Sequence, residues 1–413
     1  MIHLKSTFAA PLLAAALLSA DAAAQDRVVR LPERDRPLAG TPAHVYSIGR
    51  ADGAAHETFG IISGVAFDAA ENLYVLDRQA RRVMVYDASG RYLRQIGKEG
   101  QGPGELMVPL QLAVGGDGSV IVSDLGRRGF SVFRTDGTFV RNVVMEAWMP
   151  GMSGGIAWHP RGGIAGTFRP PFSQTGQSSV TQNVLPLLFQ PLAGGQPSRL
   201  FDIPQSLRVD QQSGGPGQVM VRVQPPPAFT PAVLMGVLPN GQTALSFTSG
   251  YTVRILDANG QTVRYLQRAM RPRLTTDADR ERARQARREA LTNGRGRIQV
   301  TIGGGGGGPG PRSAPGRQDI ERMLADMKFA DTIPALRGLR VAPSGKLWVE
   351  RTGPVVGEDG PIDLLTPEGQ YLGTITGTPL PDAISRGGLA AYIERDEDDV
   401  ERVVVRRLPG NWR

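Results

Sequence analysis

The chain of 413 residues contains no cysteine. This absence excludes disulfides, a thiol nucleophile and a lipid carried on an N-terminal cysteine. Only four histidines occur, and His44, His56 and His159 lie too far apart in sequence to form an HxH or HExxH pair. The sequence therefore carries no zinc signature, and the lack of GxSxG gives no support to nucleophilic hydrolysis. We expect His159, which follows Trp158 in a predicted turn, to lie at the surface.

Long apolar runs are also scarce, and the clearest one is near the N-terminus. Lys5 precedes the apolar stretch Phe8–Leu18, and three alanines at 22–24 follow it. This order predicts a signal peptide over residues 1–24, with export to the periplasm or the extracellular space. A membrane anchor is the alternative, although the run is shorter than the roughly 20 residues that span a bilayer. After signal removal no transmembrane segment is expected, and the oligomeric state stays open.

Glycine and proline, in contrast, are abundant, with 53 and 32 residues. This usage suits many short strands joined by turns. Phe59–Leu106 has the pattern of four strands, and its third and fourth strands are joined by a tight turn that ends at Gly90. The pattern returns 47 residues later, since Asp77 aligns with Asp124 and Gly90 with Gly137. Four strands in a repeat of this length predict the blades of a β-propeller.

The remaining repeats are less regular. A degraded third repeat covers 155–203 and is followed by a loop, Gln205–Pro227, with one candidate strand at 219–223. Clearer fourth and fifth repeats follow at 233–267 and 334–376, and the last unit, 388–408, supplies three strands at most. Residues 44–49 resemble 92–97, the outer strand of the first repeat. We therefore predict an all-β, six-bladed β-propeller over residues 42–413, closed by this N-terminal strand after an extended lead-in at 25–41.

An insertion at 271–332 interrupts the repeats between blades four and five. It contains a predicted helix at 275–293, a Gly-rich linker at Gly303–Gly310, and a second helix at 318–328. The second helix carries an apolar stripe, which we expect to dock on the propeller, formed by Ile320, Met323, Leu324 and Met327.

The positive charge is concentrated in this insertion. The chain has a formal charge of +8, and residues 271–330 hold 13 Lys or Arg against 7 Asp or Glu. Partner binding is predicted for four insertion arginines, Arg280, Arg284, Arg287 and Arg288. Ligand binding is predicted for five arginines in the loops after the second strands of blades one and two, Arg78, Arg81, Arg82, Arg127 and Arg128. Their partner would be a protein or an anionic glycan or surface; the alternative is solvated charge with local Glu–Arg pairing. Nucleic acid is not expected, because no aromatic residues are interleaved with the arginines.

The repeat resembles the NHL-type six-bladed β-propeller family. The resemblance rests on Val65–Asp68, Asn72–Asp77, Val85–Asp87, Gly90, and Ile96-Gly97 with the following Gly100–Leu106. It implies a propeller with a ligand-binding surface, but no particular activity, because such propellers serve as binding modules, lyases and hydrolases alike. The chain departs from the family at the basic loop Arg78–Arg82, which lacks the usual Asn.

Two functions follow as predictions. The preferred one is an exported, non-catalytic binding or scaffold module without a cofactor. The alternative is a metal-assisted lactonase- or lyase-type enzyme, with a divalent cation such as Ca²⁺ at the mouth of the central channel. In lactonase-like propellers a carboxylate, an Asn and an Asp hold the metal, and here the residue types are offered by Asp68, Glu71, Asn72 and Asp77. Because Asp77 recurs as Asp124, a role in capping the following loop is the competing interpretation.

Overall fold

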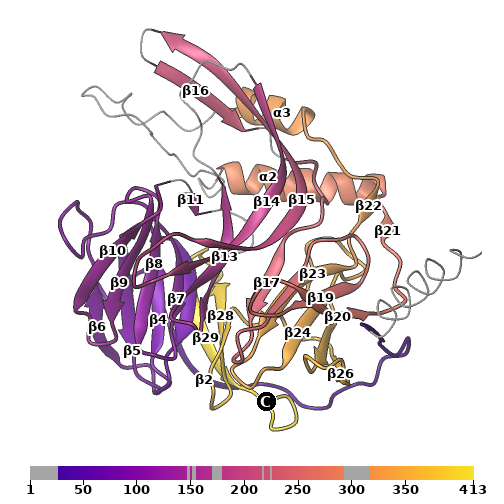
Figure 1. Cartoon of the computed structure of the whole chain (residues 1–413), viewed down its shortest axis with the longest axis horizontal. Helices are drawn as coiled ribbons and strands as arrows, with labels where there is room; N and C mark the ends of the chain where they lie inside the picture. Colours follow the sequence, from indigo (N-terminus) through magenta and orange to yellow (C-terminus); the bar gives the residue numbers. More distant parts are fainter. Residues whose placement is uncertain are drawn as a thin grey trace, which may run out of the picture.

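The computed structural model describes residues 27–146, 149–150, 155–169, 179–215, 218–223, 226–292 and 316–413. The predicted signal peptide and the Gly-rich linker lie outside these ranges. The described residues form a ring of sheets, with a hairpin and two helices rising from one face (Figure 1).

Blades one and two reproduce the 47-residue repeat. Blade one orders its strands from the channel outwards as β3 (Ile62–Phe67), β4 (Leu73–Asp77), β5 (Arg82–Tyr86) and β6 (Tyr92–Ile96). Blade two is formed in the same way by β7 (Pro109–Val114), β8 (Ser119–Asp124), β9 (Gly129–Arg134) and β10 (Phe139–Val144). Gly90 and Gly137 both adopt the positive φ that their hairpin turns require. Every residue of β4 is buried, because each blade is packed between two neighbours.

Blade three is larger than its sequence pattern suggests. Its strands are β11 (Met149–Pro150), β12 (Ile156–His159), β13 (Gly163–Arg169), β14 (Ser179–Pro191), β15 (Ser198–Gly215) and β16 (Gln218–Val223). The prediction of a loop at 205–227 was wrong, since β15 continues to Gly215 and β16 pairs back onto it. The candidate strand at 219–223 is confirmed as β16. Residues 210–215 contain no apolar residue, so this part of β15 leaves no period-two signal in the sequence.

Blades four and five are separated by the insertion, as predicted. Blade four consists of β17 (Leu234–Val237), β18 (Thr243–Ser246), β19 (Thr252–Leu256) and β20 (Thr262–Gln267). Blade five consists of β23 (Leu336–Val341), β24 (Leu347–Arg351), β25 (Ile362–Leu365) and β26 (Tyr371–Ile375).

The N-terminal strand closes the ring, which confirms the prediction. Blade six has the strands β27 (Ala383–Ile384), β28 (Leu389–Arg395) and β29 (Glu401–Arg407), and its outer strand is β2 (Ala43–Ile48). Before β2, the chain follows the outer edges of two other blades. β1 (Val28–Arg30) runs parallel to β20, and Pro37 bridges to Thr374 of blade five.

The insertion begins and ends in a two-stranded ladder. β21 (Arg273–Leu274) pairs with β22 (Thr332–Ile333), and between them lie α2 (Asp277–Thr292) and α3 (Arg317–Ala325). Thr276 caps α2, because its hydroxyl accepts a hydrogen bond from the Asp279 amide.

The prediction that the stripe of α3 docks on the propeller was wrong. Ile320 and Leu324 instead pack against Leu291 of α2, while Met323 is 42% exposed. Leu291 is the large apolar residue that ends the otherwise Ala-rich apolar side of α2, so the two helices bury their apolar residues against each other.

We call the end of the ring at which second strands join third strands the upper face. In antiparallel blades, the connections from each outer strand to the next inner strand reach this same face. It therefore carries the loops at 78–81 and 125–128 and the insertion. The first residues of β14, the last residues of β15 and the whole of β16 project from the same face, and we call them the β14–β16 extension (Figure 1).

Candidate functional site

Asp77 and Asp124 fasten the loops of the upper face. The Asp124 carboxylate accepts hydrogen bonds from the amides of Met107 and Val108 at 2.7 and 2.9 Å, and from Gly126 and Arg127 at 3.0 and 3.3 Å. Asp77 does the same for the amides of Gly60, Ile61, Gln79 and Ala80. Both side chains are fully buried. The capping interpretation is confirmed: each carboxylate joins two segments of the upper face.

We call the five arginines in the loops after the second strands of blades one and two the rim arginines. Two of them, Arg82 and Arg127, make hydrogen bonds that help to hold these loops in place. Arg82 donates to the Thr58 carbonyl at 2.8 Å and lies 3.7 Å from Asp77. Arg127 donates to the carbonyls of Gly102 and Glu105 at 2.6 and 2.8 Å. These guanidinium groups hold neighbouring connections together.

The other three rim arginines are more accessible. Arg81 pairs with Glu99, and Arg128 donates to the Glu146 carbonyl at 3.2 Å. Both have φ near +55°, an uncommon conformation for a residue with a side chain. The Arg78 side chain makes no hydrogen bond or ion pair within the described part of the chain.

The four residues considered for a metal are not brought together. Asp68 and Asn72 bond each other at 2.8 Å in the turn before β4, and Glu71 accepts a hydrogen bond from the Gly387 amide. Asp77 lies at the other end of β4. Over the described ranges, no group of three His, Asp or Glu side chains is arranged to hold a metal ion.

The insertion arginines mostly face acidic side chains. Arg280 pairs with Asp277, and Arg284 lies 3.4 Å from Glu281. Arg288 reaches both carboxylate oxygens of Glu321 at 3.2 Å, which ties α2 to α3. Arg287 is exposed, and no described side chain pairs with it.

His159 is fully buried, so the prediction of a surface histidine was wrong. Its Nδ1 accepts a hydrogen bond from the Arg161 amide, so Nε2 carries the proton and donates to the Gly241 carbonyl at 3.0 Å. Burial and the nearby Arg161 charge lower the pKa of His159. A neutral imidazole is therefore part of the contact between blades three and four. The other two are less buried: His44 bonds Ser47, and His56 stacks on Tyr92.

A buried ionic cluster at the junction of blades four and five escaped the sequence analysis. Arg268, which follows β20, lies 2.8 Å from Asp363 of β25 and 2.5 Å from Asp35 of the N-terminal segment. Arg351 lies 2.7 Å from the same Asp35. Burial opposes it, but hydrogen bonds from Arg351 and Arg268 lower the pKa of Asp35. The cluster joins the N-terminal segment to both blades.

One signal in the sequence marks this junction. Arg351 pairs with Leu336 at the position where Asp77 pairs with Ile62 in blade one. An arginine thus replaces the capping aspartate of the repeat. Tyr251 lies close to this cluster. Burial and the Asp363 charge raise the pKa of Tyr251 well above its ordinary value.

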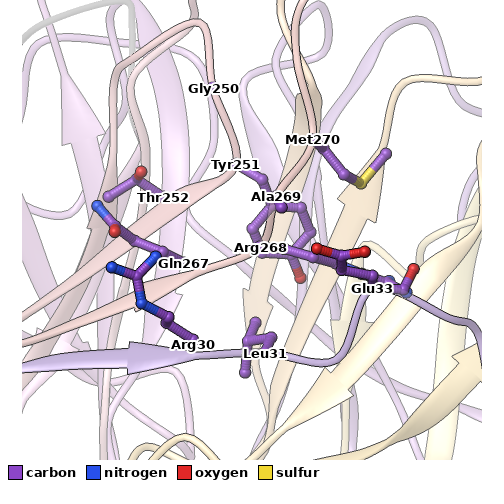
Figure 2. Close-up of a pocket in the computed structure, with 10 residues that line it drawn as sticks. All are labelled: Arg30, Leu31, Glu33, Gly250, Tyr251, Thr252, Gln267, Arg268, Ala269 and Met270. Carbon is purple, nitrogen blue, oxygen red and sulfur yellow. The ribbon is translucent and has the colours of Figure 1, made fainter.

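A pocket of about 290 Å³ opens above this cluster. Three segments line it: the N-terminal segment from Arg30 to Glu33, the beginning of β19, and the residues from Gln267 to Met270 that lead into the insertion (Figure 2). The wall combines charged and polar side chains with Met270, so it suits a small polar ligand.

A comparison with protein families supports the fold. A family model described as a 6-bladed beta-propeller matches residues 57–146. No curated protein matches the chain. Among solved structures, the chain is similar to a member of the duf4221 family from Bacteroides vulgatus, with 9% identity, a TM-score of 0.47, and coverage of 87% of this chain and 95% of that one. It is also similar to virginiamycin B lyase from Staphylococcus aureus, with 10% identity, a TM-score of 0.36, and coverage of 84% and 95%. A calcium-binding regucalcin from Agrobacterium tumefaciens has 12% identity, a TM-score of 0.38, and coverage of 90% and 96%.

Proposed function

We propose that the chain is an exported binding module of NHL type that recognises a protein through its upper face. The proposal rests on the two largest additions to the repeat, the β14–β16 extension and the insertion. Both rise from this one face (Figure 1). The segment that follows β16 also contacts the insertion, since Ala228 bridges to Phe329 and the Phe229 and Phe329 rings lie 5.8 Å apart. Additions that project together enlarge one surface, as expected for recognition of a macromolecule.

The pairing of the arginines favours a protein over an anionic glycan. Of the nine arginines considered for binding, Arg78 and Arg287 are the two without a hydrogen-bond or acidic partner over the described residues. A polyanion requires many unpaired cations along its length, whereas a protein interface needs only a few charges around apolar and polar contacts. None of the described helices is long and apolar enough to cross a membrane. The metal-assisted enzyme stays an untested alternative.

The experiment deletes the part of the insertion that lies between the paired strands β21 and β22. Because Leu274 and Thr332 are paired, residues 275–331 can be replaced by an Asn-Gly turn without separating the strand ends. Glu368→Lys is the matched control, since Glu368 is exposed in a turn on the opposite face. Proteins captured from envelope extracts by the full chain should be lost with the shortened variant and retained with the control. Each captured protein is then purified and titrated directly. Equal binding by the full and shortened chains would contradict the proposal.

A further inference from the structure

The pocket above the buried cluster presents a row of polar side chains. Gln267 of β20 is paired with Thr252 of β19 on one side and with Arg30 of β1 on the other. Directly paired residues project from the same face of a sheet, so the hydroxyl, amide and guanidinium groups lie side by side (Figure 2). All three can donate hydrogen bonds to one ligand group.

The charges at the pocket are still available to a ligand. Arg30 and Glu33 are both exposed, and neither side chain has a hydrogen-bond or ion-pair partner among the residues that the structure describes. They line the same pocket but lie on different sides of it, with the Tyr251 ring between them (Figure 2). Arg268, which also lines the pocket, is in contrast already paired with Asp35.

The wall is held in place before any ligand arrives. Arg268 donates to the Glu33 carbonyl at 3.1 Å, and the Leu31 amide donates to the Gln267 carbonyl at 2.7 Å. These bonds fix the N-terminal segment against blade four on both sides of the pocket. A preformed site loses less conformational entropy on binding.

We propose that this pocket binds a small zwitterion, namely a free α-amino acid. The ligand carboxylate accepts hydrogen bonds from Arg30 and Gln267, and its ammonium group donates to Glu33. Met270, which is half-buried, supplies an apolar contact for its side chain. A cavity of about 290 Å³ has room for one free amino acid. This site lies on the upper face beside the start of the insertion, but none of its residues belongs to β14–β16 or to the two helices proposed above to bind a protein.

The test measures the melting temperature of the full chain with each of the twenty amino acids at millimolar concentration, followed by calorimetric titration of those that raise it. The N-acetyl and carboxamide forms of the best amino acid should each bind at least about tenfold more weakly, because each removes one charge. Glucose and glucuronate serve as polar ligands that are not zwitterions.

Three variants locate the site. Arg30→Gln and Glu33→Gln should each weaken binding at least about tenfold, while Arg34→Gln, an exposed neighbour outside the pocket, should leave it unchanged. Circular dichroism verifies that each variant folds. The proposal is overturned if no amino acid raises the melting temperature, if the blocked forms or glucuronate bind as well as the free amino acid, or if Arg34→Gln weakens binding as much as Arg30→Gln.

Discussion

At the residue scale, Asp124 shows how one carboxylate can stabilise an entire connection. Asp124→Ala would remove a fully buried carboxylate and leave three backbone amides, those of Met107, Val108 and Gly126, without their acceptor, while the Arg127 amide keeps the Asp124 carbonyl. Each unsatisfied donor costs about 1–3 kcal/mol, and partial access of water reduces the total, so we expect a loss of about 3–5 kcal/mol. Asp124→Asn keeps one acceptor oxygen and should cost about 1–2 kcal/mol. Urea unfolding at pH 7 measures both values.

A second aspartate provides the control for this prediction. Asp136 lies in an exposed turn of blade two and accepts a hydrogen bond from the Thr138 amide at 2.8 Å. Asp136→Ala should shift the urea midpoint far less than Asp124→Ala. Equal shifts would show that the burial of the Asp124 cap contributes nothing.

His159 predicts a pH dependence of stability. Its pKa in the folded protein lies below the value of about 6.5 that it has in the unfolded chain. The unfolded chain therefore binds a proton more readily, and stability falls as the pH drops from about 6.5 towards the lowered pKa. The slope is at most about 1.4 kcal/mol per pH unit.

The measurement compares two substitutions between pH 7 and pH 5. His159→Gln keeps a donor for Gly241 and an acceptor for Arg161, so it should remove this part of the slope. His44→Gln, at an exposed histidine, should leave the slope unchanged. If the slopes of the wild type and of His159→Gln coincide, the buried imidazole is not the group responsible.

At the scale of elements, the strands that belong to regular repeats could be predicted from the sequence. The strands of blades one and two follow from a 47-residue period, and β2 was recognised by its likeness to β6. The extension of β15 was missed because residues 210–215 contain no apolar residue, although they pair with β16 in the ladder. The docking of α3 was misjudged because periodicity shows that a helix has an apolar face but not which surface covers it.

The candidate site was harder to predict than the fold. Arginine loops were recognised on blades one and two, but the carbonyl partners of Arg82 and Arg127 lie on the connections that precede their blades, as in the contact of Arg82 with Thr58. The pocket requires β1, β19 and β20 to meet, and the parallel pairing of β1 with β20 has no local signature. A comparison of strand registers would have marked Arg351 as the departure from the repeat.

At the scale of the whole molecule, the ring depends on one pairing between its ends. Ile48 of β2 pairs with Val403 of β29, 355 positions later. The residues that pack this seam come from blades six and one, and they include Tyr46, Val65 and Val403. The last blade is therefore incomplete until both ends of the chain are present.

Removing β2 should consequently open the ring, whereas removing only the segment before it should not. A chain that begins at residue 50 exposes the edge of β29, and an unpaired edge strand promotes association between chains. A chain that begins at residue 42 loses β1 and Asp35 but keeps β2. We expect the chain that begins at residue 42 to keep the oligomeric state of the full chain, with a lowered melting temperature, and the chain that begins at residue 50 to associate further and to unfold without a cooperative transition. Light scattering and circular dichroism distinguish these states, and a peptide of residues 42–49 added to the shorter chain should reverse its association. A shorter chain with the oligomeric state and the melting temperature of the longer one would show that β2 does not hold the ring closed.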